Sequence, residues 1–175
     1  MHVNTNIYRR LLDSDFDSLS PQVRRAHSAP LEAFGSADVQ GPTSLLGRAA
    51  ARLLRLPKPG SEVPVRLTVT ETEAGQVWDR RFGEQNFSSV QEIAGGFLAE
   101  RYGRGTLLLR VFVCNGAVHY EPAGAKLFGI TLPKFLSPRV SGVVVATDDG
   151  WQVDVEFAAP GLGRLCAYQA RLSWK

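Results

Sequence analysis

The first 60 residues place their apolar side chains with helical spacing. The stripe Ile7, Tyr8, Leu11 and Leu12 predicts a short helix over residues 7–12. Ser20 and Pro21 suit the N-cap and the first position of a second helix that runs through His27. A third helix is predicted over residues 43–56, between a Gly-Pro break and a proline stop. We therefore expect residues 1–60 to form a helical cap segment.

The third predicted helix is amphipathic. Its apolar side holds Leu45, Leu46, Ala49, Leu53 and Leu56, and its basic side holds Arg48, Arg52 and Arg55. We interpret the apolar side as packed on a sheet and the arginine side as solvated. The alternative is a surface helix that makes a weak contact with anionic lipid or with an acidic protein.

After residue 62 the pattern becomes that of β-structure. Residues 63–70 alternate and are rich in branched side chains, and turn signals recur at short intervals up to residue 150. This predicts a single α+β domain over 1–175, in which residues 61–175 form a long, curved antiparallel meander of about nine strands. We expect a half-barrel or calycin-like sheet with one helical turn near 130–137. A START-like helix-grip fold is the alternative, although the chain ends in a strand-like segment.

Four turns allow a prediction of strand register. If the loops are two residues long at 74–75, 95–96, 104–105 and 115–116, Val113 opposes Val118 and Val69 opposes Arg80. The same assumption places Gln91 opposite Glu100 and Tyr102 opposite Leu107. These registers agree on one mostly apolar, inward face. That face also carries four polar residues, Arg80, Ser89, Gln91 and Glu100.

The inward polar residues have two interpretations. In the first, Arg80 and Glu100 form a structural pair or lie at a wet rim, because an unpaired buried charge is costly. In the second, they belong to a semi-polar ligand pocket whose candidate residues are Trp78, Arg80, Gln91, Glu100, Tyr102 and Tyr120. A cavity of roughly 300 Å3 or more would favour the pocket. A close-packed interior with the two charges paired would favour the structural interpretation.

Composition and charge exclude several classes of protein. The 175 residues are 44% hydrophobic and 21% charged, which is typical of a globular domain without a membrane-spanning segment. The formal charge of +3 lies wholly in residues 1–60, with 8 Lys+Arg against 5 Asp+Glu. Nucleic acid is an unlikely partner, because the aromatic face is expected to point inward. The first ten residues lack the apolar run of a secretory signal, so we expect a cytoplasmic location.

Catalytic motifs are missing from the sequence. No nucleophile elbow, phosphate-binding loop or zinc-protease motif occurs. Cys114 and His119 share one hairpin face, but that face offers too few ligands for zinc and no third residue for a nucleophile. Asp154 and Glu156 are interpreted as the solvent face of a strand. We therefore predict no catalytic residue, no metal and no cofactor.

A series of short motifs resembles an uncharacterised bacterial family, domain of unknown function 4166 (DUF4166). The motifs are Tyr8-Arg-Arg-Leu-Leu, Leu19-Ser-Pro-Gln-Val-Arg, Gly47 to Leu56 followed by Pro57, Val63-Pro-Val, Trp78-Asp-Arg-Arg-Phe-Gly, Phe87-Ser-Ser-Val-Gln, Glu100-Arg-Tyr-Gly and Leu132-Pro-Lys-Phe-Leu-Ser-Pro-Arg. The resemblance implies no reaction. Similar domains follow a reductase-like domain in some bacterial chains, which implies an accessory or ligand-holding role.

Three functions follow from these observations. The first is a non-catalytic module that binds a hydrophobic or amphipathic small molecule inside the curved sheet, by analogy with such sheets. The second is an accessory or protein-interaction domain with a filled interior, associated with a reductase-type partner. The third is an enzyme of unrecognised type, which would need a cleft with titratable groups in mutual reach.

Overall fold

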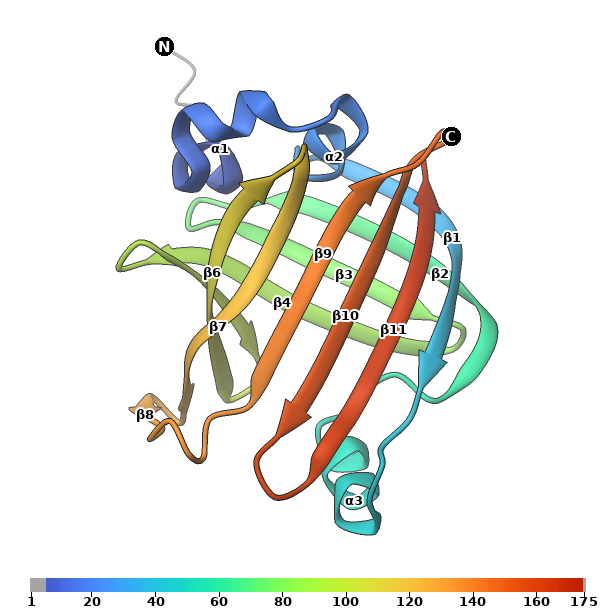
Figure 1. Ribbon diagram of the computed structural model, residues 1–175, viewed down its shortest axis with the longest axis vertical. Helices are drawn as coiled ribbons and strands as arrows, with labels where there is room; N and C mark the ends of the chain where they lie inside the picture. Colours follow the sequence, from blue (N-terminus) through green and yellow to red (C-terminus); the bar gives the residue numbers. More distant parts are fainter. Residues whose placement is uncertain (1–5, 175) are drawn as a thin grey trace.

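The computed structural model describes residues 6–174 and is dominated by antiparallel strands (Figure 1). The strands are β1 (Leu31–Gln40), β2 (Gly60–Glu71), β3 (Gln76–Phe82), β4 (Gln85–Ala94), β5 (Phe97–Tyr102), β6 (Gly105–Cys114), β7 (Ala117–Leu127), β8 (Ile130–Thr131), β9 (Arg139–Ala146), β10 (Trp151–Ala159) and β11 (Gly163–Ser173). Their order is β6-β5-β4-β3-β2-β1-β11-β10-β9-β7, and β6 also pairs with β7. Ten strands therefore close into a barrel, and the short β8 folds back to pair with the end of β7.

The closed barrel corrects the expected half-barrel. Closure depends on β1, which pairs with β2 on one side and with β11 on the other. Residues 31–40 thus form a strand inside the segment that was expected to be helical. Gly35 marks the close approach of β1 to β11, because a Cβ at this position would overlap the carbonyl oxygen of Arg171. The expected helix-grip alternative is not observed either, since the longest helix among residues 6–174 has only nine residues.

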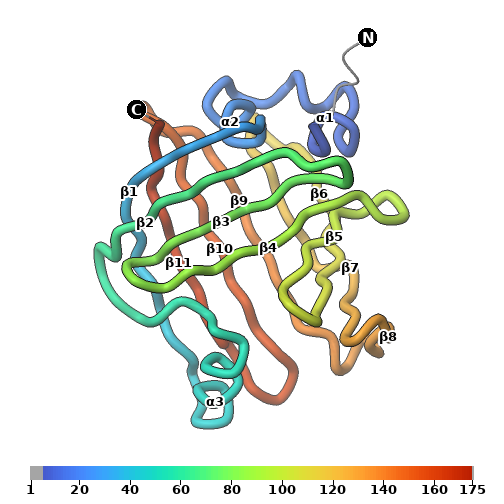
Figure 2. Tube along the Cα trace, turned by 180° about the vertical axis from the view of Figure 1, so that it is seen from behind, coloured from blue at the N-terminus to red at the C-terminus, as the bar shows by residue number. Residues whose placement is uncertain are grey.

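Short helices lie at both ends of the barrel (Figures 1 and 2). One end is capped by α1 (Ile7–Leu12), the 3-10 helix η1 (Asp13–Ser18) and α2 (Pro21–Ala26), and α3 (Leu45–Leu53) lies at the other end. The Asn6 side chain caps α1 by accepting from the backbone N–H of Tyr8 and Arg9. The predicted helices at 7–12 and 21–27 are therefore confirmed in place. No helix among residues 6–174 is long and apolar enough to cross a membrane.

The position of α3 contradicts the expected packing of its leucines. Leu45, Leu46 and Leu53 are exposed, and the buried residue of this helix is Gly47. Ser44 caps the helix through the Gly47 N–H and also donates to the carbonyl of Leu162, in the β10–β11 turn. A Cβ on Gly47 would lie 3.2 Å from that carbonyl oxygen. The helix therefore packs through its glycine and turns its leucines to solvent.

The predicted registers are correct at two turns and displaced by two residues at the other two. Val113 opposes Val118 and Gln91 opposes Glu100, as predicted. The 72–75 loop has four residues, so Val69 opposes Trp78 instead of Arg80. The β5–β6 loop is 103–104, so Glu100, instead of Tyr102, opposes Leu107. A displacement of two keeps every side chain on its face, which is why the inward face was predicted correctly.

Candidate functional site

The barrel interior holds a buried ion pair. Arg80 on β3 donates from Nη2 to Glu100 Oε1 on β5 at 3.0 Å, and their side chains are only 14% and 7% exposed. Arg80 Nη1 donates to Ser89 Oγ at 2.9 Å, and that hydroxyl donates to Glu100 Oε1 at 2.7 Å. The rings of Trp78 and Phe87 lie 5.2 and 5.9 Å from the guanidinium carbon. The two charges are therefore paired, as the first of the two sequence interpretations predicts.

The pair stays ionised inside the barrel. Burial raises the pKa of Glu100, but the Arg80 charge and hydrogen bonds from Ser89, Gln91 and Tyr102 outweigh it and lower this pKa. Burial lowers the pKa of Arg80, and the neighbouring Glu100 charge more than compensates, so its pKa is raised. Each charge thus stabilises the other where neither would tolerate burial alone.

Hydrogen bonds connect the ion pair to the helical cap. Gln91 Nε2 donates to Glu100 Oε1 at 3.1 Å, and Gln91 Oε1 accepts from the Tyr8 hydroxyl of α1 at 2.8 Å. The Tyr8 and Tyr120 oxygens lie 3.2 Å apart, and Tyr120 lies 2.7 Å from His27 Nε2. A polar chain therefore runs from the barrel centre to residue 27, at the end of α2.

His27 is neutral in this series of hydrogen-bonded side chains. Its Nδ1 lies 2.7 Å from the Val23 carbonyl and must carry the proton, so Nε2 accepts from the Tyr120 hydroxyl. Tyr8 gives its only proton to Gln91, which leaves no hydrogen for the 3.2 Å contact between the two hydroxyls. Burial lowers the pKa of His27 to about 4, and burial raises the pKa of Tyr8. The series of hydrogen-bonded side chains from Glu100 to His27 therefore lacks one proton, at the contact between the Tyr8 and Tyr120 hydroxyls.

A cavity of about 100 Å3 lies beside this network. All six residues expected at the pocket line it: Trp78, Arg80, Gln91, Glu100, Tyr102 and Tyr120. The structure adds Tyr8, His27 and Tyr168, and the signal for Tyr8 was its place on the apolar stripe of the first helix. The cavity is smaller than the roughly 300 Å3 expected of a ligand pocket, and it offers space for about three waters.

Arg80 keeps donors that the protein does not use. A guanidinium has five N–H groups, and the contacts described above engage one on each Nη atom. The other three have no hydrogen-bond acceptor among residues 6–174, and the side chain retains partial exposure beside the cavity. The inward-facing Val153 and Val155 opposite are also only partly buried. The cavity thus combines unused donors with an apolar wall.

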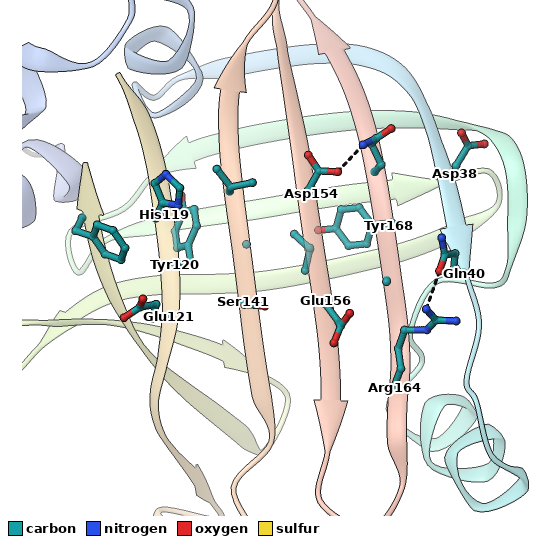
Figure 3. A pocket seen from close by; sticks show the side chains of 16 residues that line it. Asp38, Gln40, His119, Tyr120, Glu121, Ser141, Asp154, Glu156, Arg164 and Tyr168 are labelled. Atoms are coloured by element: carbon teal, nitrogen blue, oxygen red, sulfur yellow. Dashed lines mark hydrogen bonds between the residues drawn. The ribbon is translucent and has the colours of Figure 1, made fainter. Parts of the chain in front are cut away.

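A larger hollow of about 700 Å3 lies on the outer face of strands β7, β9, β10, β11 and β1 (Figure 3). It is open, its lining mixes polar and apolar side chains, and two pairs of these side chains bind each other. Gln169 donates to Asp154 at 2.7 Å, and Arg164 donates to Gln40 at 2.7 Å. Asp154 thus lies on the outer face of its strand, as expected. The hollow presents a solvated sheet surface instead of a built site.

The remaining residues that the sequence analysis considered lie outside the interior network. His119 stacks on Phe112, with ring centroids 5.2 Å apart, and Cys114 is an exposed free cysteine. Among residues 6–174, no three His, Cys, Asp or Glu side chains come together as a metal site. Arg48, Arg52 and Arg55 lie on α3 and just after it, far from the interior network (Figure 1).

Comparison with known proteins places the chain among proteins of unassigned function. The model of a family described as a domain of unknown function (DUF4166) matches residues 19–172. The chain belongs to this family. Comparison with curated proteins gives no match. A solved structure of a DUF3598 protein of unknown function from Nostoc punctiforme is similar at a TM-score of 0.49 and 14% identity. The match covers 81% of this chain and 45% of that one, so this DUF4166 chain spans less than half of it.

Proposed function

We propose that this DUF4166 protein is a non-catalytic module that binds a small molecule with a polar, uncharged group inside its barrel. The observation that carries the proposal is the set of three unused Arg80 donors beside a cavity in a closed barrel. These donors keep some exposure beside the cavity, and a ligand oxygen that accepts from them would take the place of water there. Arg80 is the anchor, and Ser89 and Glu100 hold it in place.

The charge of the site favours a neutral group. Arg80 and Glu100 cancel, so an added carboxylate would lie beside Glu100 without a cation of its own. A hydroxyl or carbonyl oxygen accepts from Arg80 without that repulsion. The opposite wall, with Val153, Val155 and the Tyr168 ring, suits a short apolar chain.

The cavity volume limits the ligand to a few non-hydrogen atoms unless the cap moves. Two-dimensional NMR titrations with a series of alcohols from ethanol to pentanol measure how affinity depends on ligand size. We expect affinity to rise with chain length and to stop rising once the cavity is full. Shifts confined to residues around the cavity support the proposal, and shifts spread over the surface contradict it.

A matched pair of variants locates the binding. Val153→Phe fills the cavity from β10, whereas Val145→Phe places the same ring on the outer face of β9. Val153→Phe is expected to abolish the alcohol response and any small-molecule adduct seen by native mass spectrometry. Val145→Phe is expected to retain both. An equal response in the two variants would refute binding in the barrel.

The second candidate is an accessory interaction domain with a filled interior, paired with a reductase-type partner. The small cavity and the completed ion pair favour it, since side chains already occupy most of the interior. The absence of both an adduct and an alcohol response in the wild-type protein would support this candidate over ligand binding.

A further inference from the structure

Exposed large hydrophobic side chains concentrate in two short segments. Within residues 6–174, nine of the ten such residues belong to them, with 44–84% of their surface exposed. They are Leu45, Leu46, Leu53 and Leu54 in and after α3, and Leu127, Phe128, Ile130, Phe135 and Leu136 around β8. Single exposed leucines are ordinary, but nine gathered in two places indicate an interaction surface.

The two segments lie at the same end of the barrel. In Figures 1 and 2, α3 and the β8 region both lie at the end opposite to α1 and α2. The β8 region is stiffened locally, because the Pro133 carbonyl accepts from the backbone N–H of Leu136 and Ser137 at 2.9 and 3.0 Å. We call this surface, formed by residues 45–58 and 126–139, the apolar-basic end.

Charge is segregated in the same way. No Asp or Glu occurs in residues 39–61 or 122–147, which together carry seven of the 20 Lys+Arg. The basic residues are Arg48, Arg52, Arg55, Lys58, Lys126, Lys134 and Arg139. The rest of the chain holds 13 basic against 17 acidic residues. A chain of modest net charge therefore has one strongly cationic end and an anionic remainder.

The arrangement of α3 suits an interface between water and lipid. At 100° per residue, Leu45, Leu46 and Leu53 share one side of the helix, whereas Gly47 lies on the side that contacts the barrel. Arg48 and Arg52 border one edge of the leucine side, so their stems can lie along an apolar layer while their guanidinium groups reach phosphates. An interfacial helix has this pattern of apolar and basic sides.

We propose that the apolar-basic end docks on the surface of an anionic lipid bilayer. The leucines of α3 and the Phe128, Ile130 and Phe135 side chains enter the boundary between headgroups and acyl chains. The seven basic residues bind lipid phosphates. A bilayer fits better than a protein partner, because the apolar residues lie on two separate projections that are both cationic and free of carboxylates. The contact does not depend on ligand binding in the barrel.

Co-sedimentation with vesicles tests the proposal. Vesicles of phosphatidylcholine with 30% phosphatidylglycerol (about a third anionic lipid) should bind the protein, and pure phosphatidylcholine vesicles should bind it far less. Arg48→Gln/Arg52→Gln/Arg55→Gln should lower the partition coefficient by about 100-fold, since each basic residue near an anionic surface contributes about fivefold. The matched control, Arg10→Gln/Arg25→Gln/Arg110→Gln, removes exposed arginines elsewhere and should change it by less than about fivefold.

The apolar contribution is tested separately. Leu46→Ser/Leu53→Ser and Phe128→Ser/Phe135→Ser should each weaken vesicle binding by at least about tenfold, with unchanged thermal midpoints because these side chains are exposed. Equal losses in the Arg10/Arg25/Arg110 control, or no preference for anionic vesicles, would overturn the proposal. So would sedimentation velocity that shows a dimer broken by the leucine variant without any vesicle binding, because a second copy would then be the occupant.

Discussion

His27 should make the protein lose stability in mildly acidic solution. The ring is 2% exposed, holds the Val23 carbonyl through Nδ1 and receives the Tyr120 hydroxyl at Nε2. Protonation would place a charge beside buried Tyr8 and Trp78, whose rings lie 4.5 and 6.3 Å away by centroid. It would also require Tyr120 to turn its proton toward Tyr8. The extra proton would allow a hydrogen bond from the Tyr120 hydroxyl to the Tyr8 hydroxyl. The cost of burying the positive charge is larger, so the pKa of His27 is lowered.

The two pKa values of His27 set the sign and the size of the effect. The pKa is 6.5 for an ordinary histidine and about 4 in the fold, so between these values the unfolded chain binds more protons. This contribution to stability is present above pH 6.5 and is lost as the pH falls toward 4. Between pH 7.5 and pH 5.0 the loss is about 2 kcal/mol. Glu100 stays ionised in this range, because its folded pKa lies below 4.5.

Urea unfolding at pH 7.5, 6.5, 5.5 and 5.0, followed by tryptophan fluorescence, measures this loss. His27→Gln should be less stable at pH 7.5, yet its stability should change by less than about 0.5 kcal/mol down to pH 5.0. His119→Gln, on the outer face, serves as the control and should keep the wild-type dependence. A wild-type protein with flat stability, or a His27→Gln variant with the full slope, would show that another group is responsible.

Three further predictions follow from buried contacts and exposed surface. Glu100→Gln leaves Arg80 without a counter-charge and should cost about 3–5 kcal/mol in urea unfolding, whereas the double variant Arg80→Met/Glu100→Leu should recover much of that loss. Gly35→Ala should prevent closure of β1 onto β11 and lower the thermal midpoint by more than about 10 °C, whereas Gly105→Ala, whose Cβ would make ordinary contacts, should change it by a few degrees at most. Leu53→Ser should leave the midpoint unchanged, because the side chain is 84% exposed; a clear drop would show that Leu53 itself packs on the barrel.

The inward face of the barrel was predictable because strand alternation tolerates errors of two residues. Both misjudged loops displaced the register by two, so Arg80 and Glu100 stayed inside although their predicted partners were wrong. Gly-containing turns limit each loop to a few lengths, and the apolar pattern selects the length that keeps valines and leucines inward. The ion pair was therefore accessible to sequence reasoning, whereas its link to Tyr8 and His27 depended on the placement of the cap.

The parts that failed depended on contacts between distant segments. Gly35 and Ser36 interrupt the apolar alternation of β1, which makes this strand hard to predict from sequence. The missing side chain at Gly35 is nevertheless what allows β11 to approach closely. The sequence correctly indicates that α3 is amphipathic, but its apolar side was expected to be buried against the sheet. The pattern alone does not distinguish a helix that faces a core from one that faces a membrane or a partner. In α3 the decisive residue is Gly47, whose missing side chain determines which side touches the barrel.

The segregation of charge also constrains how the barrel meets an anionic surface. The apolar-basic end carries seven positive charges, whereas the remainder is anionic by a formal difference of four, so a bilayer attracts this end more strongly than the rest of the molecule. Screening at physiological salt acts over about 8 Å, which weakens this orienting field at a distance but not at contact. Once the positive charges have oriented this end toward the bilayer, the exposed leucines of α3 stabilise the contact by entering the apolar layer. On this basis the α1–α2 cap, with the His27 chain beneath it, faces away from the lipid, so the interior network and the docking surface can be perturbed independently.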